Sequence, residues 1–105
     1  MKLRHLGTSG LRVSVVGLGC NNFGRNVDRD AARAVIYKAL DMGVTLFDTG
    51  DTYGHRGGSE TIMGEVLGAR RKDIVLATKF GRPMDDEASC KEGRAATSCS
   101  RWRRA

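Results

Sequence analysis

The sequence predicts an α/β protein in which parallel strands are covered by helices. Three short apolar segments with the composition of strands alternate with two segments whose apolar residues recur at helical spacing. The strand segments are apolar without alternation, as strands buried on both faces are. A chain of 105 residues is one domain at most and is short enough to be part of one.

The first predicted element is a hairpin in residues 2–14, and an apolar strand is expected at 13–18. Glycines in the Gly-Thr-Ser-Gly turn of the hairpin supply the positive φ that a tight reversal requires. A helix is predicted over 29–42, because Asp28 can accept a hydrogen bond from its first N–H groups and Gly43 can end it. Its apolar positions recur at helical spacing: Ala32, Val35, Ile36, Ala39 and Leu40.

The pattern continues with a second strand at 44–47. Ser59 is expected to cap a second helix that ends near Gly68, and the apolar residues of this helix face one way: Ile62, Met63, Val66 and Leu67. A charged turn at 69–73 leads to a third strand at 74–78.

Three polar side chains follow the ends of these strands: Asp48 and Tyr53 after the second strand, and Lys79 after the third. Reactive residues of parallel α/β folds gather at the carboxyl ends of strands. A phenol has a pKa of about 10, so Tyr53 would need a nearby cation to act as an acid, and Lys79 could be that cation. Asp48 is placed to balance the charge of Lys79. Taken singly, each residue is more often a solvated loop or packing residue.

The glycine-rich segment GLGCNNFG follows the first strand. As a dinucleotide-binding fingerprint it is weak, because Asn22 stands where the pattern G-x-G-x-x-G requires its third glycine. A turn that only reverses the chain is the alternative.

The motifs become specific as a set. In order and with natural spacing, GTSGLRVSVVGLGCNNFG, DRDAARAVIYKALDMGVTLFDTGDTYG, GGSETIMGEVL and DIVLATKFG resemble the N-terminal part of the aldo-keto reductases, over residues 1 to about 87. The resemblance implies an N-terminal fragment of a (β/α)₈ TIM barrel, with an N-terminal β-hairpin at its base and about three of the eight parallel strands. It also implies an NADPH-dependent oxidoreductase that reduces aldehydes and ketones to alcohols by hydride transfer.

The same resemblance implies roles for individual residues. Tyr53 would be the general acid, Lys79 would lower its pKa, and Asp48 would support Lys79. The residues implied to bind the cofactor are Gly17, Leu18, Gly19, Cys20, Asn21 and Asp48, and the expected partner is a small carbonyl substrate. The family's catalytic histidine follows a fourth strand, which the sequence does not show, so we expect the chain to be inactive alone. The residues that hold the 2′-phosphate are likewise absent, which leaves the preference for NADPH over NADH open.

The composition indicates the state of the cysteines, the cellular location and the distribution of charge. Cys20, Cys90 and Cys99 are odd in number and have no C-x-x-C spacing, so we expect free thiols and no metal site. No signal peptide or membrane-spanning segment is visible, and the expected location is the cytoplasm. The net charge of +6 is uneven: residues 1–87 carry +2 and residues 88–105 carry +4.

The basic tail, residues 88–105, is expected to lie outside the resemblance. One encoding of AATSCSRWRR reads Arg-Tyr-Ile-Met-Leu-Ala-Val-Glu-Ala in a shifted frame, which resembles the family's next helix. A frameshift between about 87 and 94 is therefore a hypothesis that the nucleotide sequence can test. Two other functions remain open: a cofactor-binding fragment without catalysis, and a nucleic-acid binder that uses the RWRR segment.

Overall fold

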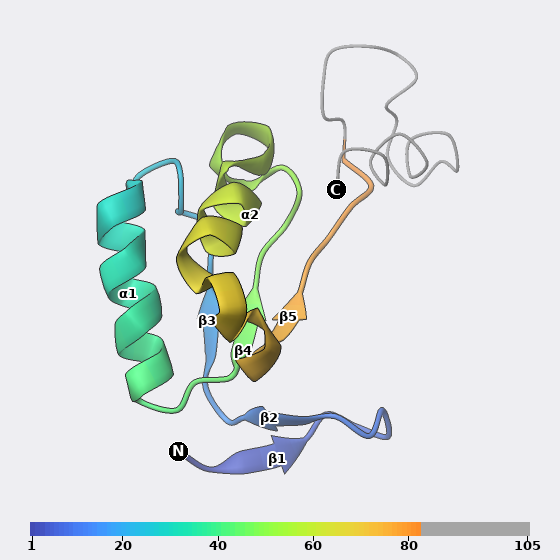
Figure 1. Ribbon diagram of the computed structural model, residues 1–105. Coiled ribbons are helices and arrows are strands. Elements are labelled where there is room, and N and C mark those ends of the chain that lie inside the picture. The colour runs from blue at the N-terminus through green and yellow to red at the C-terminus, as the bar shows by residue number, and fades with distance from the viewer. Residues whose placement is uncertain (83–105) are drawn as a thin grey trace.

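The computed structural model describes residues 1–82, which form a hairpin, a parallel sheet and the helices that cover it (Figure 1). The hairpin pairs β1 (Leu3–His5) with β2 (Arg12–Ser14). The sheet has the order β3 (Gly17–Gly19), β4 (Leu46–Asp48), β5 (Val75–Ala77), and both pairings are parallel. The helices are α1 (Arg29–Asp41), α2 (Tyr53–Leu67) and the 3₁₀ helix η1 (Gly68–Asp73). The expected boundary at 87, the basic tail and Cys90 and Cys99 lie outside the described residues.

The hairpin, the parallel sheet and helix α1 confirm the predicted α/β order. Asp28 caps α1, because its Oδ1 accepts a hydrogen bond of 2.9 Å from the N–H of Ala31. After α1 ends, Gly43 adopts a φ of +86°, a conformation that favours glycine. Three of the five apolar positions predicted for this helix are buried: Ala32, Ile36 and Ala39. Val35 differs, because 40% of it is exposed.

The single strand predicted at 13–18 is wrong: the chain bends after β2 and resumes as β3. Ser14 accounts for the bend, because its hydroxyl donates to the carbonyl of Val16 at 2.6 Å and accepts the N–H of Thr45 at 2.9 Å. The N–H of Ser14 in turn donates to Thr45 Oγ1 at 2.9 Å. These bonds fasten the hairpin to the segment that enters β4.

Helix α2 also begins differently from the prediction. Its assigned span starts at Tyr53, but residues 54–57 have positive φ and form a left-handed turn before the regular helix. Ser59 therefore does not cap the helix; it is fully buried, and its hydroxyl donates to the carbonyl of Cys20 at 2.8 Å. The charged turn predicted at 69–73 is the 3₁₀ helix η1, which begins one residue earlier.

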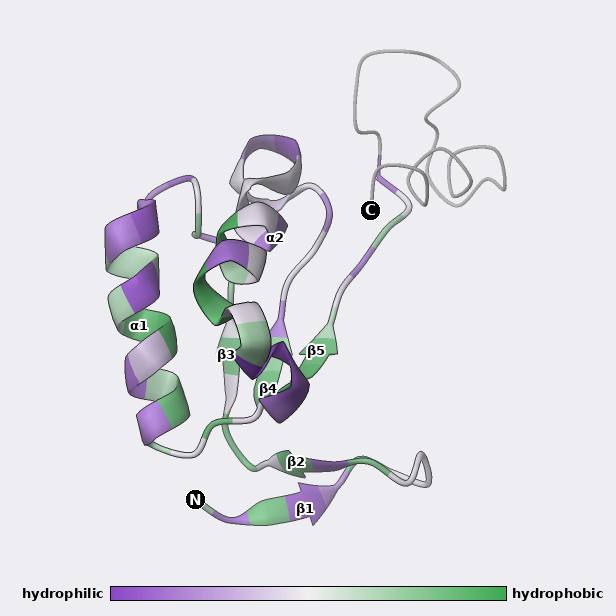
Figure 2. Ribbon diagram, in the orientation of Figure 1, coloured by the Kyte–Doolittle hydropathy of each residue, from purple (hydrophilic) through white to green (hydrophobic). Residues whose placement is uncertain are grey.

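The core lies between the parallel sheet and the two α-helices. Phe47 on β4 is fully buried and joins residues of both helices in one cluster. Figure 2 shows hydrophilic and hydrophobic residues alternating along α1, as expected for a helix with one buried face. The buried apolar residues of the cluster are Cys20, Phe23, Ala32, Ile36, Ala39, Val44, Phe47, Met63, Val66, Leu67 and Ile74. Within residues 1–82, no helix has the length and apolar character needed to cross a membrane.

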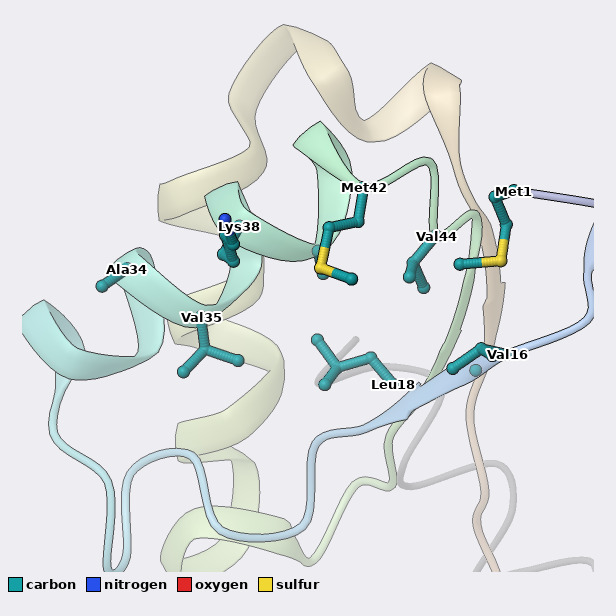
Figure 3. Close-up of a pocket in the computed structure, with 10 residues that line it drawn as sticks. Met1, Val16, Leu18, Ala34, Val35, Lys38, Met42 and Val44 are labelled. Carbon is teal, nitrogen blue, oxygen red and sulfur yellow. The ribbon is translucent and has the colours of Figure 1, made fainter.

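An apolar groove runs between α1 and the edge strand β3, with a volume of about 500 Å³. Val35 and Leu18 point into it from opposite sides, and Met42 lies further along α1 (Figure 3). Met1 and Val16 line its far end. The groove explains why Val35 is exposed although its position follows the helical pattern of the core.

We expect this groove to bind the aromatic rings of the anionic dye anilinonaphthalene sulfonate. Val35→Glu places a carboxylate in the groove, so the anionic dye should bind at least about tenfold more weakly, because an unbalanced charge in apolar surroundings is costly. Ala31→Glu, at an exposed position of the same helix outside the groove, changes the net charge equally and should leave dye binding unchanged. Fluorescence titration measures both. Equal dye binding by the two variants would contradict the prediction that the dye binds in this groove.

Candidate active site

The candidate site lies at the carboxyl ends of the parallel strands, where Asp48 faces away from the helices. Successive side chains of a strand point to opposite faces. Because Phe47 is buried beneath the helices, the next residue, Asp48, points to the other face, and its side chain is 50% exposed. In the sheet, Asp48 pairs with Gly19 on one side and Ala77 on the other. The carboxylate therefore stands at the carboxyl end of the central strand.

Lys79 meets Asp48 across the two strands. Lys79 Nζ lies 2.6 Å from Asp48 Oδ1 and donates a second hydrogen bond, of 3.1 Å, to the carbonyl oxygen of Thr49. The hydrogen bond to Asp48 raises the pKa of Lys79 above its ordinary value of 10.5, and partial desolvation opposes this only in part. The ammonium group is therefore charged throughout the neutral pH range.

Tyr53 completes the predicted trio. It follows the loop after β4, and Lys79 Nζ lies 5.3 Å from the centroid of its ring. The ring packs over Gly50, where an added Cβ would lie 3.2–3.3 Å from three ring atoms. The structure thus brings together the three side chains that the sequence singled out at the strand ends, with the ammonium between the carboxylate and the phenol ring.

The residues predicted to bind a cofactor divide between the two faces of β3 and the loop after it. Gly17, Gly19 and Asn21 are exposed, and a Cβ at Gly19 would meet no atom within 4 Å. The side chain of Leu18 instead lines the groove beside α1. Cys20 is fully buried in the core, and burial raises the pKa of its thiol to about 11. Leu18 and Cys20 can therefore offer only backbone atoms to a molecule bound at Asp48.

The left-handed turn at residues 54–57 and the role of Ser59 were not predicted from the sequence. Gly54 has a φ of +71°, and a Cβ there would lie 2.3 Å from the carbonyl oxygen of Phe23 and 2.5 Å from the N of Ser59. His55 and Arg56 share the left-handed conformation, which is uncommon for residues with a side chain. The signal was present in the segment Gly-His-Arg-Gly-Gly, whose glycines disfavour a regular helix.

Comparison with known proteins identifies the family. A model described as the aldo/keto reductase family matches residues 15–105 and so extends beyond residue 87, where the sequence-based resemblance ended. An oxidoreductase of Bacillus subtilis, YqkF, is 43% identical over 86 residues, which are 82% of this chain and 27% of YqkF. The chain thus spans about a quarter of this relative's length.

Two solved structures share the fold. The holo form of the aldo-keto reductase AKR11C1 from Bacillus halodurans is 40% identical with a TM-score of 0.74, covering 84% of this chain and 29% of its own. The PA4992 protein of Pseudomonas aeruginosa is 35% identical with a TM-score of 0.81, covering 97% of this chain and 40% of its own. These neighbours are (β/α)₈ barrels, which confirms the predicted fold class: the chain corresponds to the N-terminal part of such a barrel.

The raised pKa of Lys79 predicts how the stability depends on pH. A lysine whose folded-state pKa lies above its unfolded value stabilises the fold fully below pH 10.5, and this contribution is lost as the pH rises through the folded-state value. Because both side chains are about half exposed, solvent screening limits the effect to about 1 kcal/mol or less. Asp48→Asn removes the cause and should bring the pKa of Lys79 down towards 10.5.

An NMR titration of the Lys79 side chain measures this shift. Asp73→Asn, which removes a carboxylate paired with Arg70 in η1, is the matched control and should leave the Lys79 titration unchanged. A Lys79 midpoint that is the same with Asp48 and with Asn at that position would refute the prediction.

The close packing at Gly54 predicts a large cost for any side chain there. Gly54→Ala combines a clash with backbone atoms and a left-handed φ, and should lower the free energy of unfolding by about 2 kcal/mol or more. Gly64→Ala is the control, since a Cβ at Gly64 in α2 meets no atom within 4 Å, and alanine there should stabilise the helix by up to about 1 kcal/mol. Denaturant unfolding of both variants distinguishes these outcomes, and an unchanged Gly54→Ala protein would count against the packing described.

Proposed function

Because this chain belongs to the aldo/keto reductase family, we propose that it forms the proton-donating part of an NADPH-dependent reductase of aldehydes and ketones. The observation that carries the proposal is the contact between Asp48 and Lys79 beside the ring of Tyr53. The chain spans 27% to 40% of the relatives described above, so the activity is proposed for the whole barrel that contains these residues. The cytoplasm is the proposed location.

Tyr53 is the proposed acid. As a carbonyl is reduced, negative charge develops on its oxygen, and the phenol O–H of Tyr53 supplies the proton that neutralises it. The phenolate left on Tyr53 is stabilised by the ammonium of Lys79, which is 5.3 Å from the ring centroid. Asp48 keeps that ammonium charged and oriented through its hydrogen bond of 2.6 Å. Each group thus has one electrostatic task.

The surface next to Asp48 is open at Gly19, which pairs with Asp48 in the sheet and where an added Cβ would meet no atom within 4 Å. Gly17 lies two residues earlier, where an added Cβ would lie 3.3 Å from Leu46. We propose that these glycines, Asn21 and the carboxylate of Asp48 hold the nicotinamide cofactor, while Leu18 and Cys20 contribute backbone atoms. When bound, a reduced nicotinamide supplies the hydride.

Turnover is proposed to need further parts of the barrel. The described residues contain two histidines, His5 in β1 and His55 in the turn after Tyr53, and neither follows a fourth strand of the parallel sheet. Residues 1–82 therefore supply three of the four catalytic groups that the family resemblance implies. A cofactor-binding segment without turnover is the behaviour we expect of the chain by itself.

Replacing Tyr53 by Phe tests the proposed acid. The variant keeps the ring over Gly50 but loses the proton, so reduction of an aromatic aldehyde should fall by about 10²-fold to 10⁴-fold while NADPH still binds. The assay follows NADPH oxidation in a hybrid barrel, in which residues 1–82 replace the matching segment of the Bacillus halodurans reductase. Fluorescence titration reports NADPH binding. Near-normal turnover of the Tyr53→Phe hybrid would refute the proposal.

Lys79→Met in the same hybrid provides an internal check. It removes the cation that stabilises the phenolate and leaves Asp48 without its hydrogen-bond donor, so turnover should also fall steeply. Since both substitutions disable the same proton transfer, the double variant should be little worse than Tyr53→Phe alone. Fully additive losses would mean that the two residues act in separate steps.

A further inference from the structure

Two buried hydroxyl groups lie directly behind the candidate site. Thr49 follows Asp48 in the chain, Ser59 lies in α2, and both residues have no exposed surface. Thr49 Oγ1 and Ser59 Oγ are 2.8 Å apart, and Ser59 Oγ donates to the carbonyl oxygen of Cys20 at 2.8 Å. Hydroxyl groups are costly to bury unless they are hydrogen-bonded, and here each is.

The direction of the hydrogen bond between the two hydroxyls follows from the number of protons that each can donate. A serine hydroxyl has one proton, and that of Ser59 is committed to the carbonyl of Cys20. Thr49 must therefore donate to Ser59, which makes a directed chain from Thr49 through Ser59 to Cys20. Each proton in the chain has one acceptor, so removing Ser59 would disturb both ends.

The hydrogen-bonded hydroxyl chain joins the loops that follow β3 and β4 to the helix that begins with Tyr53. Cys20 directly follows β3 and Thr49 directly follows β4. The next residue of α2, Glu60, is bonded to the segment after β5, because its Oε1 accepts a hydrogen bond of 2.5 Å from the hydroxyl of Thr78. Two consecutive residues of α2 are thus bonded to the segments after all three strands of the parallel sheet.

The hydroxyl chain also reaches the charged pair. The carbonyl oxygen of Thr49 is the second acceptor of Lys79 Nζ, at 3.1 Å, and the N–H of Thr49 donates to the carbonyl of Ala77 at 2.8 Å. The side chain of Thr49 is held by Ser59, so the orientation of this peptide depends on the buried chain. Lys79 is therefore fixed from two sides, by the carboxylate of Asp48 and by a carbonyl that the hydroxyls hold in place.

We propose that Thr49 and Ser59 are positioning residues for the proton-donating group: their hydroxyl chain holds the Thr49 carbonyl and α2 so that Lys79 stays between Asp48 and Tyr53. The inference rests on the proposed function, but its geometric part concerns Lys79 alone. A displacement of about 1 Å at a catalytic group can cost up to about 10²-fold in rate. Neither residue touches substrate in this scheme.

The first test is an NMR titration of Lys79 in the 105-residue chain, with its signal assigned through Lys79→Arg. Thr49→Val keeps the shape of the side chain and removes the donor, while Ser59→Ala removes the link between Thr49 and Cys20. Each should lower the titration midpoint of Lys79 from its raised value towards 10.5, because the ammonium is held less firmly beside Asp48. The double variant should resemble Ser59→Ala, since both substitutions break one chain.

Ser14→Ala is the matched control. Ser14 is also a buried serine, and its hydroxyl donates one hydrogen bond and accepts two, but it lies at the other end of the sheet, where β4 begins. It should lower the thermal midpoint as the site variants do, without moving the Lys79 titration. If Ser59→Ala fails to fold, Thr49→Val alone still carries the comparison with Ser14→Ala.

The second test uses the hybrid barrel. Thr49→Val should lower kcat by roughly tenfold with little change in KM, and should shift the alkaline limb of the pH profile of kcat, whereas Ser14→Ala should do neither. An unchanged Lys79 midpoint and pH profile in both site variants, with only the thermal midpoint lowered, would overturn the inference. A hybrid without any reductase activity would count against the proposed function, and the Lys79 titration would then still decide the positioning role.

Discussion

The hydrogen bond between Lys79 and Asp48 joins two parallel strands at their carboxyl ends, and the candidate site is arranged around it. The two residues are 31 positions apart in the chain and 2.6 Å apart in space. A pair that is half exposed contributes little to stability, so it cannot be what holds the strands together. The backbone does this: the N–H of Thr49 donates to Ala77 and the N–H of Asp51 donates to Lys79, which continues the ladder between β4 and β5 beyond the strands. These backbone hydrogen bonds fix the distance between the two strand ends. At that distance the ammonium group of Lys79 lies beside the carboxylate of Asp48.

Short strands make the side-chain hydroxyls important. Each strand of the parallel sheet has three residues, and backbone bonds within such strands are few. Buried hydroxyls supplement them at both ends of the sheet: Ser14 at the base, where the hairpin meets β4, and Thr49 with Ser59 at the top. No charged group of the site lies at the base, whereas Thr49 at the top directly follows Asp48 in the chain. Buried hydroxyl groups thus attach the hairpin to β4 at the base and, in our proposal, orient Lys79 at the top.

The sequence predicted the layers and the charged trio because both follow from local patterns. Helix α1 was found from Asp28 and its helical apolar spacing, and the trio from the rule that polar residues gather where parallel strands end. The start of α2 was not predicted, because Ser59 fits a cap by residue type while its real partners, Cys20 and Thr49, are 39 and 10 positions away. Side-chain bonds between distant segments leave no periodic signal. The break of the strand at 13–18 was missed for the same reason, since Ser14 bonds to residues 31 and 32 positions ahead.

The groove beside α1 is a second feature that the sequence pattern did not predict. The apolar spacing of α1 placed Val35 with Ile36 and Ala39, yet only the latter two are buried against the sheet. Val35 faces Leu18 across the groove, and exposed Met42 continues the apolar lining along α1 (Figure 3). Helical periodicity records which side of a helix is apolar but not which part of the protein covers it. The described residues cover only part of this apolar face, so the apolar pattern of α1 is wider than the core that residues 1–82 build.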